Sequence, residues 1–341
     1  MKKKWVVLLG CFLSGVAFSD NLKDEKQIFS NDLDGINRKE SNIYLQEEEA
    51  PKNYINQNIR LNSDAQDGLV RFTLGEGYMS FNEKMWMTYR LRKFNDTNED
   101  KNPAFEGNDL RLRLYYGVGE IGEGIEAHHR LEYRSVSDSY DRVKWNYEVN
   151  FAKRLGLEDP GEYFVVRPLL GWASNKVDSK GNDYDSVITG LEGLVSFKVW
   201  REWYFQFNAY GQYHFNFGDE YEDRYGVDNV AVLSLEAYLL NETKLIDLGQ
   251  DTSLNFYFEG GFDPANFYAK KHEFMTMEGM DSFQQQYSLY AMPELNIKHE
   301  LESGFIIKGA IGMESRNQRG NDEISDYNNQ VYLSIGWETR Y

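Results

Sequence analysis

The chain has 341 residues and a formal net charge of −18. Proteins that bind nucleic acids present basic surfaces, so this acidic balance argues against a nucleic-acid partner. The mean hydropathy is −0.64, and after the N-terminus no stretch approaches 18 consecutive apolar residues, which excludes a membrane protein built from spanning helices.

Residues 1–19 have the pattern of a signal peptide. Three lysines precede an apolar run from Trp5 to Phe18, and a small-x-small cleavage site ends at Ser19. We therefore expect an exported protein that is cut near Ser19. An alternative is a lipoprotein signal, because the residues before Cys11 resemble a lipoprotein box. Cys11 is the only cysteine, so after cleavage near Ser19 no thiol would remain for disulfide, zinc or nucleophile chemistry.

Residues 20–53 are rich in Asp, Asn, Lys and Glu and show no sustained period of two or 3.6. Such a segment buries too little apolar surface to offset the entropy of ordering it. We predict a flexible acidic segment on the periplasmic side of a membrane. No motif in it distinguishes a solvated segment from a short plug or a contact with the cell wall.

From residue 54 onward the chain consists of segments in which apolar and polar residues alternate with period two. In the segment 142–153, Val143 and Trp145 fall on one face, and Arg142 and Lys144 fall on the other. Strands are expected at 54–61, 69–80, 84–94, 108–117, 124–135, 142–153, 163–173, 185–199, 201–217, 229–241, 252–262, 284–299, 304–315 and 330–341. The count is fourteen, with twelve and sixteen as alternatives.

The final strand alternates most clearly. Leu333, Ile335 and Trp337 share one face with the terminal Tyr341, while polar residues occupy the other. It resembles the closing strand of bacterial outer-membrane β-barrels, whose terminal aromatic residue is that class's assembly signal. We therefore predict an all-β, transmembrane, antiparallel up-and-down β-barrel over residues 54–341, with short periplasmic turns and long outer loops.

Two observations bear on that architecture. A soluble β-sandwich would also alternate, but its strands are usually shorter, and apolar aromatic faces on every strand would leave no side for water. Pro168 and Pro293 fall inside expected strands, where each removes a backbone donor. We expect β-bulges or strand ends at both prolines.

If the apolar face meets lipid, the charged face lines the lumen. Two basic residues on each of four consecutive strands would form a cationic patch, and later strands contribute single acids on the opposite wall. A transverse field would result, which would admit small ions of both signs; the alternative is that ladder pairs neutralise one another and hold the wall rigid. The predicted pore-lining basic residues are Arg90, Arg92, Arg111, Arg113, Arg130, Arg134, Arg142 and Lys144, and the acidic ones are Glu192, Glu236, Glu259, Glu294, Glu314 and Glu338.

The long polar breaks are candidates for a constriction. The break 95–107 is acidic and follows Arg92 directly, so folding inward would set its carboxylates opposite the basic patch. The break 263–283 is the competing candidate, and either could be a plain surface loop. The candidate constriction residues are Asp96, Glu99, Asp100, Phe105 and Glu106.

Paired arginines on strands such as 110–116 and the closing residues 336–341 resemble the FomA-type major porins of fusobacterial outer membranes. That resemblance implies an outer-membrane protein that lets small hydrophilic solutes and ions diffuse passively, without enzymatic activity, cofactor or metal. It also implies that the protein contacts outer-membrane lipid, assembles into homotrimers and adheres through its outer loops. Trp337 and Tyr341 would belong to the signal that the barrel-assembly machinery recognises. Small outward residues would suit a flat contact between subunits: Ala209, Gly211, Ala231, Ala237 and Gly309.

Two other functions remain open. A non-conducting structural or adhesive barrel would have the same sequence pattern as a porin. An outer-membrane hydrolase would need a catalytic histidine, but outward-facing His129 lacks a serine two residues later, and His128 and His214 face inward without a recognisable Ser-His-Asp spacing.

Overall fold

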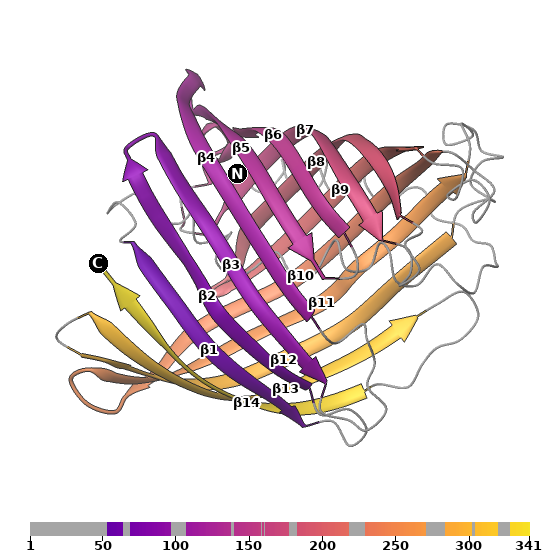
Figure 1. Ribbon diagram of the computed structural model, residues 1–341. Helices are drawn as coiled ribbons and strands as arrows, with labels where there is room; N and C mark the ends of the chain where they lie inside the picture. The colour runs from indigo at the N-terminus through magenta and orange to yellow at the C-terminus, as the bar shows by residue number, and fades with distance from the viewer. Residues whose placement is uncertain are drawn as a thin grey trace.

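The computed structural model describes residues 53–63, 69–96, 107–137, 140–157, 159, 161–176, 183–217, 229–270, 284–301, 304–319 and 328–341. The predicted signal peptide and all of the predicted acidic segment except Asn53 lie outside these residues. The described part folds as one closed antiparallel barrel of fourteen strands (Figure 1). The strands are β1 (Tyr54–Ser63), β2 (Leu69–Asn82), β3 (Met85–Asp96), β4 (Gly107–Gly122), β5 (Ile125–Val136), β6 (Tyr140–Asn150), β7 (Tyr163–Lys176), β8 (Asp183–Trp200), β9 (Trp203–Phe217), β10 (Asn229–Asp247), β11 (Thr252–Lys270), β12 (Gln284–Glu300), β13 (Phe305–Arg319) and β14 (Asn328–Arg340).

Each strand pairs with its neighbours in the sequence, and β1 pairs with β14 to close the ring. The closing ladder runs without a register shift from Tyr54 opposite Arg340 to Ser63 opposite Val331. In Figure 1 the indigo β1 and the yellow β14 accordingly lie side by side. The prediction of a fourteen-stranded antiparallel barrel is confirmed.

The two faces of each strand are separated as the alternation predicts. On β14, Leu333 is 55% exposed whereas the neighbouring inward residue, Tyr332, is 1% exposed. The same contrast holds on β6, where Val143 and Trp145 are exposed and Arg142 is buried. The barrel therefore carries its apolar side chains outside and its charged side chains inside, the reverse of a water-soluble barrel.

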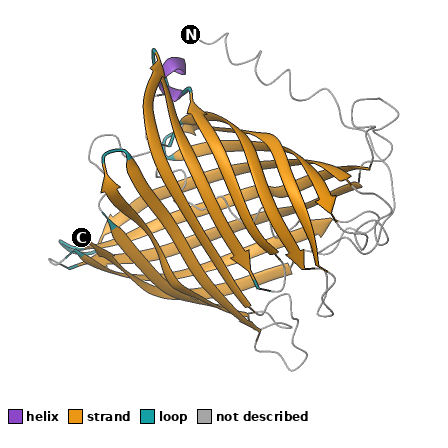
Figure 2. Cartoon of the chain, turned by 45° about the horizontal axis from the view of Figure 1, so that its top comes forward, coloured by secondary structure: helices purple, strands orange, loops and turns teal. Residues whose placement is uncertain are grey.

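The described short connections and both ends of the barrel domain lie at one end of the barrel (Figure 2). Residues 83–84, 123–124, 201–202 and 248–251 join successive strands there, and the short helix α3 (Ala152–Leu155) lies between β6 and β7. The Tyr341 amide donates a 2.9 Å hydrogen bond to the Asn53 carbonyl. Within the described residues, no helix is long and apolar enough to cross a membrane.

Several strands are longer than the alternation predicts. The break predicted at 263–283 begins later, because β11 continues to Lys270, and the candidate loop 95–107 begins after Asp96, the last residue of β3. The alternation of β2 is interrupted at a register shift between Thr73 and Gly75 in the ladder with β3. A bulge inserts one extra residue and so inverts the alternation beyond it.

The predicted bulges or strand ends at the prolines are wrong. Pro168 lies inside β7, paired with Leu191, and Pro293 lies inside β12, paired with Phe258. On the other side of each proline two consecutive residue pairs are missing from the ladder, yet the register is the same before and after the gap. The missing donor thus interrupts the ladder toward one neighbour only, and the pairing on both sides of the gap holds the strand in place.

Candidate functional site

Four arginines form a row across the inner face of β3 to β6. Arg90 lies directly opposite Arg111, Arg111 opposite Arg134, and Arg134 opposite Arg142. All four side chains are buried. Like charges that lie directly opposite each other destabilise a sheet, so this row requires carboxylates next to it.

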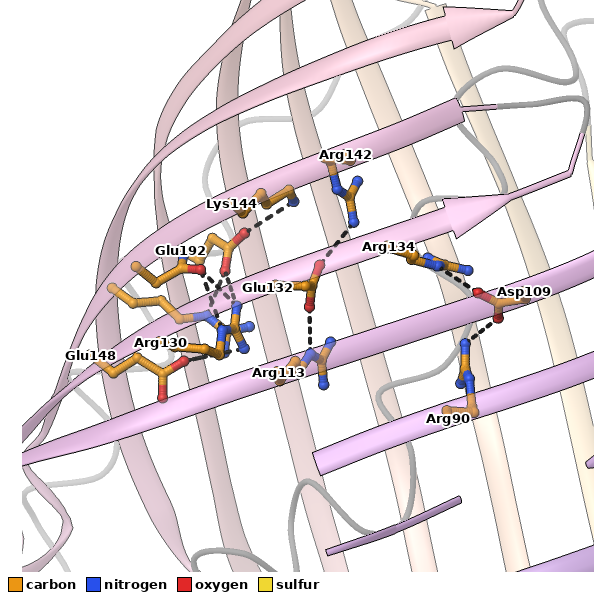
Figure 3. A network of polar contacts seen from close by, with 12 residues as sticks. Arg90, Asp109, Arg113, Arg130, Glu132, Arg134, Arg142, Lys144, Glu148 and Glu192 are labelled. Atoms are coloured by element: carbon orange, nitrogen blue, oxygen red, sulfur yellow. Dashed lines mark hydrogen bonds and ion pairs between the residues drawn. The ribbon is translucent and has the colours of Figure 1, made fainter. Parts of the chain in front are cut away.

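Two carboxylates bracket the row, and each one bridges two cations. Asp109 accepts hydrogen bonds from Arg90 at 2.5 Å and from Arg134 at 3.1 Å. Glu132 likewise binds Arg142 at 3.1 Å and also binds Arg113. Figure 3 shows these side chains pointing toward one another from neighbouring strands.

Glu148 and Glu192 bridge the cations at the β5 to β8 end of the same network. Arg167 donates to Glu148 at 3.0 Å and to Glu192 at 2.5 Å. Arg130 lies 3.2 Å from Glu148 and 3.9 Å from Glu192, and Lys144 lies 3.8 Å from Glu192. We call the whole set the basic-wall network: Arg90, Asp109, Arg113, Arg130, Glu132, Arg134, Arg142, Lys144, Glu148, Arg167 and Glu192.

The network places two residues differently from the sequence analysis. Glu192 was grouped with the acids of the opposite wall, but it is bound by cations of β5, β6 and β7. Arg167 was missed, although it occupies an inward position of the expected strand 163–173 and alternation alone would have found it. Its inward neighbours Val165 and Leu169 are apolar, so Arg167 does not belong to a series of charged inward residues on its own strand.

The basic-wall network is closely packed. Its side chains are between 0 and 10% exposed. Seven cations face four carboxylates, a formal excess of three positive charges (7 − 4). Buried ion pairs hold their geometry only when further hydrogen bonds satisfy them, and shared carboxylates supply these here. The shared carboxylates therefore hold these side chains against the wall, while the network keeps a formal excess of positive charge.

Apolar side chains flank the network on the inner face of β7 and β8. One buried cluster contains Tyr163, Val165 and Leu194. The second contains Leu169, Ala173 and Ile188 and lies on the other side of Arg167 along β7. Apolar packing on both sides restricts the Arg167 side chain to the carboxylates between the clusters.

The acids of β10 to β12 have a different environment, made of hydroxyl and amide donors. Glu236 accepts hydrogen bonds from Asn208 at 2.9 Å and from Tyr210 at 3.2 Å. Tyr290 donates to Glu259 at 2.5 Å, and Tyr257 also donates to it. Glu294 accepts from Tyr332 at 2.9 Å. The inward tyrosines therefore hold carboxylates in place on this side of the barrel.

Near the seam, where β1 pairs with β14 to close the barrel, the predicted acids Glu314 and Glu338 each bind two cations. Arg60 and Arg316 both lie 2.9 Å from Glu314. Arg340 lies 2.8 Å from Glu338, which also binds Lys308. The Arg60 guanidinium stacks 3.6 Å from the centre of the Tyr332 ring, so one arginine joins β1 to β13 and β14.

The other predicted residues are placed as follows. Arg92 lies 3.7 Å from Glu76 of β2. Trp337 lies on the outer face and donates to Gln57 at 2.8 Å, and the Tyr341 side chain is exposed. Asp96 ends β3. The remaining candidate constriction residues, Glu99, Asp100, Phe105 and Glu106, lie outside the described residues.

The histidines have no catalytic arrangement in the described contacts. His129 packs against the rings of Trp145 and Tyr147. His128 lies 3.8 Å from Glu148, and His214 lies 3.3 Å from Gln212. Across the described ranges no group of three or more His, Cys, Asp or Glu residues could hold a metal ion.

No protein-family model matches the sequence, and none of the curated proteins compared with it is a match. Among solved structures, the chain is similar to a loop-deletion mutant of OmpT, an outer membrane protein of Vibrio cholerae, with 9% identity over 85% of this chain and 98% of that one and a TM-score of 0.38. The NanC porin gives 8% identity over 84% and 100% of the chains and a TM-score of 0.34. Omp33 of Acinetobacter baumannii gives 7% identity over 85% and 98% and a TM-score of 0.33. The fold assignment itself rests on the strand pairing.

Proposed function

We propose that this protein is a bacterial outer-membrane porin that lets small hydrophilic solutes and ions diffuse passively through its barrel. The observation that carries the proposal is the reversal of its faces: outward residues such as Leu333 and Ile335 are apolar and exposed, whereas inward positions carry charge. In water such an exterior would associate with other apolar surfaces. In a bilayer it meets acyl chains.

Energetics support the same orientation. An arginine on the lipid face of a barrel costs about 2–4 kcal/mol at the middle of the bilayer. The barrel has its arginine row on the inner face. Side chains can fill the interior of an eight-stranded barrel, but a barrel of fourteen strands has a wider interior. A polar wall around a wide barrel suits hydrated solutes.

The proposal extends to export, assembly and oligomeric state. Residues 1–19 would direct export, the C-terminal strand with Trp337 and Tyr341 would bind the barrel-assembly machinery, and the assembled protein would form homotrimers. Ala231 and Ala237 lie on the outer face of β10, and small outward residues would suit a flat subunit contact. Light scattering of the purified protein in detergent would give the subunit number.

Single-channel recording tests the central proposal. Purified protein, refolded in detergent and added to a planar bilayer in KCl, should give stepwise currents, and vesicles containing it should swell in solutions of small sugars. The matched control is the same protein heated until its barrel unfolds. Absence of stepwise current from a correctly folded barrel would contradict a porin.

One observation favours a second function, a non-conducting structural or adhesive barrel. The basic-wall network is almost completely buried, so a large part of the inner wall is packed rather than wet. A barrel with this function would bind a partner through its outer surface and give no stepwise current. The same recording therefore separates the two functions.

A further inference from the structure

The inner wall of the barrel is not uniformly covered. Side chains of the basic-wall network on β3 to β8 are at most 10% exposed. On β13 and β14 the inward cations are far more accessible: Lys308 is 27%, Arg316 is 32% and Arg340 is 44% exposed. These two regions lie on opposite sides of the closed strand order.

Two small residues face each other on the inner side of β13 and β14. Ala310 of β13 lies directly opposite Ser334 of β14, and Ser334 lies opposite Arg60 of β1. Ala310 and Ser334 are both partly exposed, whereas arginine, lysine and glutamate side chains fill the wall from β3 to β8.

The accessible charge on this side is positive. Lys308 is more exposed than its partner Glu338, which is 7% exposed, and Arg316 is more exposed than Glu314, at 21%. Each carboxylate thus lies against the wall beneath its cations. A solute passing here meets ammonium and guanidinium groups before it meets carboxylates, which favours anions.

We propose that the permeation path is eccentric, running along β13 and β14 rather than along the barrel axis, and that Lys308 and Arg316 make it selective for small anions. This inference rests on the proposed porin function and names its solute class. The basic-wall network then keeps the opposite wall, from β3 to β8, closely packed and outside the permeation path. Small carboxylates and inorganic phosphate are the solutes with which accessible ammonium and guanidinium groups form charge-assisted hydrogen bonds.

Thiol labelling during channel recording tests the position of the path. Ser334→Cys and Ser234→Cys make the same substitution at inward positions of similar depth, the seventh residue of β14 and the sixth of β10, but Ser234 is buried. Cys11 is the only native cysteine, so both variants are made with Cys11→Ser. A negatively charged methanethiosulfonate should reduce the current through Ser334→Cys and leave Ser234→Cys unchanged.

Reversal potentials test the selectivity. In a KCl gradient the wild-type protein should favour chloride, and Arg316→Gln should shift the reversal potential toward the potassium value. The matched control is Arg154→Gln, which removes the same charge from α3, between β6 and β7, on the side of the barrel away from β13. Phosphate added to one side should reduce the chloride current of the wild type more than that of Arg316→Gln.

The outcomes separate this inference from the proposed function. A folded barrel that conducts nothing refutes the porin and this inference with it. A barrel that conducts but is blocked equally at Ser334→Cys and Ser234→Cys, or at Ser234→Cys alone, remains a porin and overturns the eccentric path. An unchanged reversal potential in Arg316→Gln overturns the proposed anion selectivity.

Discussion

The ring of Tyr332 lies flat against Gly312 of the adjacent strand, so that a Cβ atom on Gly312 would come within 2.3 Å of the tyrosine ring and of its hydroxyl. This close approach lets Tyr332 reach Glu294 with its hydroxyl and carry Arg60 on its other face. One glycine therefore permits a set of contacts that joins β12, β13, β14 and β1 across the seam.

Substituting Gly312→Ala should destabilise the barrel. The added methyl group would displace the Tyr332 ring, and overpacking of this kind typically costs about 1–3 kcal/mol. Gly309→Ala on the same strand is the control, because a Cβ there meets nothing within 4 Å. Urea unfolding in detergent, followed by tryptophan fluorescence, measures both variants; equal midpoints would show that Tyr332 does not depend on the space above Gly312.

Substituting Glu132→Gln should destabilise the basic-wall network. Glu132 is buried between Arg113 and Arg142, and removing one partner of a buried ion pair costs about 3–5 kcal/mol. Glu123→Gln is the matched control, since the exposed Glu123 pairs only with the exposed Arg154 in the described contacts, and such surface changes stay within about 0.5 kcal/mol. The free energy of unfolding, measured for both variants, tests this prediction. If the two variants lose the same amount, the network does not hold the wall.

Substituting Ile335→Arg tests whether the outer face meets lipid. Ile335 lies in the middle of β14 and is exposed, so an arginine there should cost about 2–4 kcal/mol of folding free energy in a bilayer. Thr339→Arg, near the end of the same strand, should cost about 0–1 kcal/mol. Equilibrium folding into phospholipid vesicles in urea measures both. Equal costs at the two depths are expected for a water-facing exterior and would contradict the membrane assignment.

Substituting Tyr341→Ala separates assembly from stability. The Tyr341 side chain is exposed and its amide bonds the Asn53 carbonyl, a contact that alanine retains. Stability of the refolded protein should therefore change by less than about 0.5 kcal/mol, while the fraction that reaches the outer membrane in cells should fall. Tyr116→Ala, at an exposed aromatic position of β4, is the control. Normal assembly of Tyr341→Ala would rule out an assembly signal at the C-terminus.

The architecture could be predicted from the sequence because it depends on local periodicity. Side chains of a strand alternate by geometry, so the pattern of Val143, Trp145, Arg142 and Lys144 fixes which face each residue occupies before any partner strand is known. The fourteen segments in which such a pattern was expected correspond to the fourteen strands, although a bulge interrupts the pattern in β2. The inward position of the basic residues follows from the same rule.

Pairing between strands required the tertiary structure. The pattern does not say that Glu192 meets Arg130 and Arg167, or that Tyr332 covers Gly312, because those contacts depend on the register of strands distant in sequence. Bulges such as the one at Thr73 and the uninterrupted register at Pro168 also depend on both neighbouring strands.

The sequence alone determined that the barrel sheet has a polar inner face and an apolar outer face, since alternation is a property of the single strand. Only the tertiary structure decided which inward charges are buried together and which remain open, since that depends on the lengths of side chains that closure brings opposite one another. The side chains of β3 to β8 fill their wall, whereas Lys308, Arg316 and Arg340 of β13 and β14 remain partly exposed.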